Sequence, residues 1–128
     1  MQTKRLPSRY DCLAPDGSQI RLLAAGERGS CVHCTLPPGA VSLAVRHRSV
    51  EEIWYFVHGQ GEVWRKLDGT EETVEVSQGV CVTIPSGAHF QFRNTADTPL
   101  EFVLTTMPPW PGDQEAVRVA DHWPVTEA

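Results

Sequence analysis

His47 and Glu52 are the residues whose types and spacing are best suited to chemistry. His47 ends the alternating apolar run 41–47, and Glu52 begins the alternating run 52–58. Alternate residues of a strand share a face, so both polar side chains point inward if the apolar residues do. Burying a carboxylate alone is costly, and the imidazole across the short turn is a natural partner. The sequence therefore predicts an inward-facing His–Glu pair that could act as acid and base or bind a metal.

Apolar and aromatic residues near this pair could form the wall of a ligand pocket. The candidates for the wall are Val45, Trp54, Phe56, Phe90 and Phe92. His33 shares a strand face with Cys31 and Thr35, so it could line the pocket or face solvent. Aromatic walls with a few convergent polar groups are typical of small-molecule pockets, but aromatic residues of this kind more often fill a core.

Turn-forming residues recur every eight to twelve residues, which is typical of a β-sandwich or barrel. The expected strands are 10–14, 18–25, 30–36, 41–47, 52–58, 62–66, 72–76, 80–84, 88–94 and 99–107. The prolines after Met107 end this regular spacing of strands and turns. Residues 113–120 are expected to form one or two helical turns. We therefore expect a single all-β domain over 1–128, with an N-terminal arm (1–17), a barrel core (about 18–107) and a C-terminal strap (108–128). Trp110 and Trp123 could hold this strap on the barrel or on a partner subunit.

Composition limits the classes of function. The chain has 128 residues and a net charge of −5, which argues against nucleic-acid binding. It has no apolar run long enough for a membrane span and no signal-peptide core, so we expect a cytoplasmic protein. Cys31 and Cys34 form a CxxC with no second pair at zinc-site spacing, and residues three apart in a strand diverge. They are expected to be ordinary strand cysteines.

The spacing of two segments resembles the two signature motifs of the cupin family. The first has Gly39, five residues, Val45-Arg46-His47, four residues, Glu52, six residues and Gly59. The second has Gly79, five residues, Pro85-Ser86-Gly87, two residues, Phe90, three residues and Asn94. The resemblance covers residues 39–94 and implies a jelly-roll barrel, the double-stranded β-helix.

The resemblance also implies a metal site, but two of its four ligand positions differ. Val45 and Phe90 stand where the family has histidines, whereas His47 and Glu52 are kept. A β-bulge could turn His89 inward to join them. The expectation is either no cofactor or one divalent transition metal (Fe, Mn, Ni, Cu or Zn) on His47 and Glu52 with help from His89.

Three kinds of function remain open. The first is a small-molecule-binding barrel, without tightly bound metal, whose pocket around His47 and Glu52 takes a sugar-like ligand or a small keto or hydroxy acid. The second is a cupin enzyme, an isomerase or epimerase, dioxygenase or decarboxylase, that uses the same pair as acid and base or in a non-standard metal site. The third is a structural or regulatory module. Resemblance to cupins also implies a homodimer.

Overall fold

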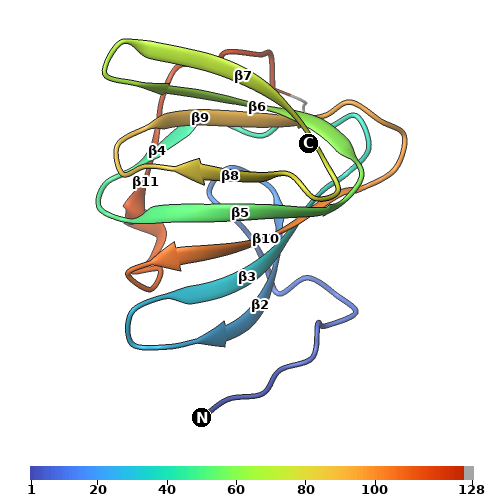
Figure 1. The fold of residues 1–128 in the computed structure, drawn as a ribbon, viewed down its shortest axis with the longest axis vertical. Helices are drawn as coiled ribbons and strands as arrows, with labels where there is room; N and C mark the ends of the chain where they lie inside the picture. The colour runs from blue at the N-terminus through green and yellow to red at the C-terminus, as the bar shows by residue number, and fades with distance from the viewer. Residues whose placement is uncertain (126–128) are drawn as a thin grey trace.

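The computed structural model describes residues 1–125, which form two packed antiparallel β-sheets (Figure 1). The strands are β1 (Cys12–Leu13), β2 (Gln19–Ala25), β3 (Ser30–Leu36), β4 (Val45–His47), β5 (Glu51–His58), β6 (Gln60–Leu67), β7 (Thr70–Ser77), β8 (Cys81–Ile84), β9 (His89–Asn94), β10 (Leu100–Met107) and β11 (Ala116–Arg118). One sheet has the order β1-β2-β3-β10-β5-β8, and the other has the order β11-β4-β9-β6-β7. The prediction of an all-β fold is confirmed.

The expected strand 41–47 is the one that the structure shortens most. Only Val45–His47 forms β4, and Val41 makes a single bridge to Arg93. The amide of Leu43 donates instead to the carbonyl of Asp16, in the turn between β1 and β2. Alternation in the sequence could not reveal this, because the partner of Leu43 lies far away in the chain.

Aromatic residues fill the space between the two sheets. Trp54, Phe56 and Phe92 are at most 1% exposed, because alternate residues of β5 and β9 point inward. The rings of Trp54 and Phe102 are stacked with centroids 4.5 Å apart, and Phe90 meets the Trp54 ring edge-on. Such packing fixes the positions of β5, β9 and β10 relative to one another.

Gly59, in the turn between β5 and β6, satisfies two backbone requirements. Its φ of +89° lies in the left-handed region, where residues with a Cβ are disfavoured. A Cβ at this position would also collide with the backbone carbonyl of Pro99. The glycine that ends the first motif is therefore required by the turn itself.

The segment after β10 is more extended than the sequence predicted. Asp113–Glu115 forms a single 3-10 turn, and Ala116–Arg118 then pairs with β4 as an edge strand. The expected helical turns are thus largely replaced by β11, because the free edge of β4 offers backbone partners. Residues 126–128 of the predicted strap lie outside the described residues.

The rest of the C-terminal segment lies on the outer face of the second sheet. The side chain of Gln91 accepts hydrogen bonds from the amides of His122 and Trp123 and donates one to the Trp123 carbonyl. The guanidinium of Arg93 lies 4.4 Å from the centroid of the Trp123 ring. Trp123 therefore fixes this segment on the barrel.

The N-terminal arm runs beside β2 (Figure 1). The side chain of Arg21 donates to the carbonyls of Pro7 and Ser8, and the amide of Ala25 donates to the side chain of Gln2. Among residues 1–125 there is no helix with the length and hydropathy needed to cross a membrane.

Candidate functional site

A cavity of about 510 Å³ lies in the barrel interior and opens beside β1 and β2. Trp54, Phe90 and Phe102 line its deep part and are almost completely buried. Leu13 and Leu22 line the mouth and are 57% and 45% exposed. Large apolar side chains are thus exposed at the entrance to an internal space, as in a ligand-binding pocket.

His47 and Glu52 both line this cavity and come from strands of different sheets. His47 ends β4 and is 4% exposed, and Glu52 follows the turn into β5 and is 5% exposed. The Nδ1 atom of His47 and the Oε1 atom of Glu52 are 4.0 Å apart, which is too long for a hydrogen bond. The sequence prediction that both side chains face inward agrees with this geometry.

Glu52 is held in place by two neutral donors. The indole Nε1 of Trp54 donates to Oε1 at 3.0 Å, and the hydroxyl of Thr106 donates to Oε2 at 2.6 Å. Burial raises the pKa of Glu52 from 4.5 to about 7, even though these two hydrogen bonds lower it. Near neutral pH, this carboxyl group can therefore both give and take a proton.

His47 is held by rings rather than by hydrogen bonds. Its imidazole meets the rings of Phe90 and Trp110 edge-on, with centroids 5.1 and 5.2 Å apart. Its Nδ1 is buried without a hydrogen-bond partner among the described residues. Burial lowers the pKa of His47 from 6.5 to about 4, and the charge of Glu115 opposes this shift only partly. At neutral pH, His47 and Glu52 are therefore not an ion pair, and the imidazole offers one donor and one acceptor nitrogen.

Glu115, from the C-terminal segment, fixes the turn that carries the pair. Its Oε1 accepts hydrogen bonds from the backbone amides of Ser49 (2.6 Å) and Val50 (2.7 Å) and from the Ser49 hydroxyl (2.9 Å). Burial opposes ionisation of Glu115, but these hydrogen bonds outweigh it and lower its pKa. Sequence reasoning missed this residue, because nothing in the local pattern links position 115 to the turn at 49–50.

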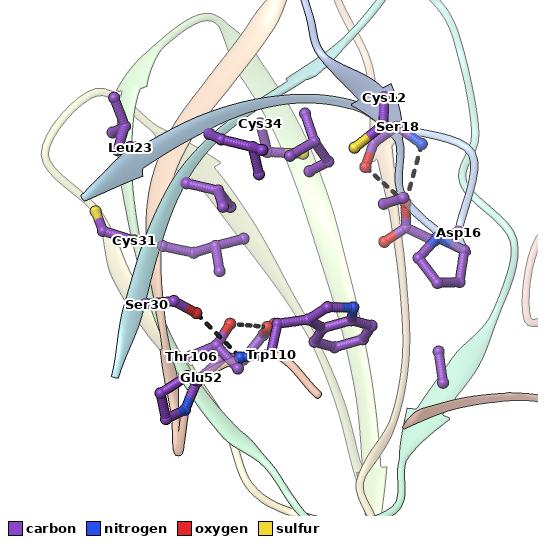
Figure 2. A pocket seen from close by; sticks show the side chains of 18 of the residues that line it. Cys12, Asp16, Ser18, Leu23, Ser30, Cys31, Cys34, Glu52, Thr106 and Trp110 are labelled. Carbon is purple, nitrogen blue, oxygen red and sulfur yellow. Dashed lines mark hydrogen bonds between the residues drawn. The ribbon is translucent and has the colours of Figure 1, made fainter. Parts of the chain in front are cut away.

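Trp110 is a second contribution of the C-terminal segment. It lines the cavity beside His47, and its backbone amide donates to the hydroxyl of Ser30 at 3.1 Å (Figure 2). The sequence singled out Trp110 as an anchor of the segment but not as part of the pocket.

A second polar group lines the cavity at Asp16 and Ser18, on the side opposite Glu52 and Thr106 (Figure 2). Oδ1 of Asp16 accepts hydrogen bonds from the amide (2.9 Å) and hydroxyl (2.6 Å) of Ser18. Burial raises the pKa of Asp16, against these hydrogen bonds. The sequence showed Asp16 only as a turn residue, and indeed it lies between β1 and β2.

The structure separates the predicted wall residues into two sets. Val45, Trp54 and Phe90 line the cavity. Phe56 and Phe92 point inward but belong to the packed core and do not line it. This difference depends on depth in the barrel, which the alternation of strand residues does not reveal.

His33 is buried, with 4% of its surface exposed, but it does not line the cavity. It pairs with Glu101 of the neighbouring strand, with Nε2 and Oε1 3.3 Å apart. Of the CxxC cysteines, Cys34 is buried in the core and Cys31 is partly exposed, and both are free thiols. Burial raises the pKa of Cys34 well above its ordinary value, so it is a poor nucleophile.

The residues present do not assemble the donor set that the family's metal site requires. Val45 and Phe90 face each other across β4 and β9 and offer no ligand atoms. His89 pairs in regular register with Arg46 and Lys66, with no bulge to turn it inward. Within residues 1–125, no group of three or more His, Cys, Asp or Glu side chains could hold an ion. Because protein metal sites usually offer three or more ligands, these residues do not fit the metal of the family.

Comparisons with known proteins agree with this architecture. A model of the cupin domain matches residues 32–106, more than half of the chain. Uncharacterized protein MJ1618 of Methanocaldococcus jannaschii is 30% identical over 116 residues, which span 84% of this chain and 90% of that protein.

Solved structures give the same fold at lower identity. A Klebsiella pneumoniae protein with a double-stranded β-helix domain has a TM-score of 0.67 and 15% identity, over 81% of this chain and 85% of that chain. BH2720 of Bacillus halodurans has a TM-score of 0.66 and 22% identity, over 73% of this chain and 72% of that chain. Oxalate decarboxylase of Bacillus subtilis has a TM-score of 0.72 and 17% identity, over 88% of this chain but 30% of that chain. At these identities the likeness concerns the fold alone. Together with the match to the domain model, it establishes that the chain belongs to the cupin family and has its double-stranded β-helix fold.

Proposed function

We propose that this cupin binds a small organic molecule in its barrel cavity, with His47 and Glu52 as polar contacts and without a tightly bound metal. The observation that carries the proposal is the cavity of about 510 Å³, where a buried imidazole, with no hydrogen-bond partner at Nδ1 among the described residues, and a buried carboxyl group lie among aromatic walls. Pockets that bind small molecules combine apolar walls with a few polar groups in this way. A hydrogen bond from the ligand would give His47 the partner it lacks.

The ligand classes suggested by the sequence are sugar-like compounds and small keto or hydroxy acids. A hydroxyl group suits the site because it can donate to the Glu52 carboxylate or accept from the carboxylic acid form, and its carbon frame can pack on Trp54 and Phe90. An acid suits it less well, because Lys4, on the exposed N-terminal arm, is the only Lys or Arg that lines the cavity among the described residues.

The test is a screen of sugars, hydroxy acids and keto acids by thermal stabilisation of the untagged protein. A ligand at about 100 times its Kd stabilises the folded state by about 2.7 kcal/mol, which raises Tm by several degrees. The pocket variants are His47→Gln and Glu52→Gln, and the control is Ile53→Thr on the exposed face of the same strand. A compound that stabilises the wild type and Ile53→Thr but neither pocket variant supports the proposal. Equal stabilisation of all four proteins refutes it for that compound, and stoichiometric metal in the untagged protein contradicts the metal-free part.

A second candidate function is acid–base catalysis by the same pair. It is favoured by a specific observation, the Glu52 carboxyl group with a pKa of about 7 beside a neutral imidazole. Such a pair could remove a proton from the carbon next to a carbonyl group and return it to another position or face, as in isomerisation or epimerisation. Of the enzyme classes suggested by the family resemblance, this one needs no metal.

Proton exchange tests this second candidate directly. Aldoses and ketoses incubated with the protein in D₂O would lose the NMR signal of the C–H bond next to the carbonyl as deuterium replaces the proton. His47→Gln and Glu52→Gln should both abolish the exchange while Ile53→Thr retains it. Exchange that persists in both pocket variants would rule out this pair as the acid and base.

A further inference from the structure

The cavity has polar groups on two sides, and only one of them belongs to the His47–Glu52 pair. Glu52 and Thr106 lie on one side, and Asp16 and Ser18 lie on the other, with the cavity between them (Figure 2). Apolar side chains of β2, β3 and β10 line the space in between, among them Val32 and Leu104. A ligand that fills this cavity therefore meets a polar group, an apolar wall and a second polar group.

The charged groups deep in the cavity are both carboxyls. Glu52 is 5% exposed, and Asp16 is partly buried in the turn between β1 and β2. Burial raises the pKa of both carboxyl groups, and the negative charge of Asp16 raises the pKa of Glu52 further. No lysine or arginine other than Lys4 lines the cavity in the described part of the chain. An anionic ligand would thus lie between two carboxyl groups, with only the exposed Lys4 among the described residues to balance its charge.

The free hydrogen-bonding capacity of the two sides favours a ligand that donates. Oδ1 of Asp16 accepts both hydrogen bonds from Ser18, and Oδ2 accepts none from the described residues. The hydroxyls of Ser18 and Thr106 already donate to carboxyl oxygens, so neither has a proton left for the ligand. The neutral imidazole of the buried His47, 4% exposed and without a hydrogen-bond partner at Nδ1 among the described residues, offers the ligand one acceptor nitrogen and one donor nitrogen.

We propose that the cavity takes an elongated, largely apolar molecule that carries a hydrogen-bond donor, a hydroxyl or an amine, at each end and that is not an acid. One donor meets the His47–Glu52 side, and the other meets Asp16. This inference rests on the proposed small-molecule binding and narrows its ligand class, excluding both the keto and hydroxy acids and sugars with hydroxyl groups along the whole carbon chain. Asp16 becomes a specificity-determining residue for the second end of the ligand.

Four probes with the same six-carbon chain test the inference: hexanol, hexanediol, diaminohexane and adipic acid. Their binding is followed by NMR titration of the ¹⁵N-labelled, untagged protein, with the amides near His47 and Asp16 as separate reporters. Hexanediol or diaminohexane should bind about tenfold more tightly than hexanol, because a second hydrogen bond to a carboxylate is gained. Adipic acid should bind at least about tenfold more weakly than hexanediol. The relative affinities of the diol and the diamine distinguish hydroxyl from amine recognition.

Asp16→Asn is the decisive variant, and Asp97→Asn, in an exposed loop, is its matched control. Asp16→Asn should reduce the affinity for the diol or the diamine, whichever binds more tightly to the wild type, to the affinity for hexanol. It should leave the affinity for hexanol unchanged. Asp97→Asn should change neither affinity. If hexanol shifts the amides near His47 but the diol and the diamine bind no more tightly, the small-molecule site stands and this inference fails. It also fails if adipic acid binds as tightly as the diol, or if Asp16→Asn weakens hexanol equally. No shift with any of the probes would count against the proposed function and the inference together.

Discussion

Replacing Glu115 with alanine should destabilise the fold strongly, although Glu115 lies outside the barrel motifs. The Val50 amide donates to Glu115, and Val50 is 0% exposed, so this donor would lose its partner where water cannot easily replace it. An unpaired buried donor costs about 1–3 kcal/mol, and loss of the hydrogen bonds from the exposed Ser49 adds about 1 kcal/mol. The expected loss is therefore about 2–4 kcal/mol of unfolding free energy.

Glu115→Gln separates the contribution of the negative charge to stability from the contribution of the hydrogen bonds. The amide oxygen of glutamine can still accept from both backbone amides, so this variant should lose about 1 kcal/mol. Urea unfolding measures both variants, and the alanine variant should lower the midpoint by roughly 1–2 M. Glu51→Ala is the control, because Glu51 is an exposed acid next to the same turn whose side chain makes no hydrogen bond to the described residues.

The pH dependence gives an independent check on the role of Glu115. Its hydrogen bonds hold the pKa below 4.5 in the folded state, so its ionised form is favoured by folding. This contribution to stability is fully present above pH 4.5 and is lost as the pH falls through the folded-state pKa. The difference between wild type and Glu115→Ala should therefore shrink in acid. A loss below about 1 kcal/mol for alanine, or equal losses for alanine and glutamine, would refute the reasoning.

Three further perturbations test other parts of the structure. The raised pKa of Glu52 means that the folded state holds its proton more tightly, so stability should fall as the pH rises from 4.5 to about 7. Glu52→Gln should remove this loss, roughly 3 kcal/mol, and a pH profile parallel to that of the wild type would contradict the assignment. The imidazole NMR signals of His47 should titrate near pH 4, and a midpoint at 6.5 would show that the ring is not desolvated. Thermal unfolding should show that Gly59→Ala destabilises the protein by more than about 2 kcal/mol. Gly79→Ala should cost about 1 kcal/mol, because Gly79 also has a positive φ but has open space around its Cα. We also propose that the protein forms a homodimer, and sedimentation that detects only monomer at high micromolar concentration would count against it.

The positions of most strands could be predicted because they depend on local rules. Turn residues such as Pro15-Asp16-Gly17 and Asp68-Gly69 end strands wherever they occur, and both hairpins are present in the structure. The inward direction of His47 and Glu52 likewise follows from alternation along a strand, which holds whatever the rest of the chain does.

The depth of a side chain in the barrel could not be predicted in the same way. Phe56 and Phe90 both alternate into the interior, but only Phe90 reaches the cavity, because depth depends on how the two sheets pack. The same limit applies to His33, whose burial depends on neighbours that a single strand does not contain.

The sequence by itself determined the all-β class, the cupin spacing and the inward-facing His47–Glu52 pair, since each depends on residues close together in the chain. Only the tertiary structure placed Glu115 under the turn at 49–50, Trp110 against His47, and Asp16 in the cavity that Glu52 also lines. These contacts join segments far apart in the chain, and no local periodicity encodes which distant backbone or ring will meet. The physical character of the pocket, with two carboxyl groups in its interior and no lysine or arginine beside them among the described residues, therefore emerges only when the chain is folded.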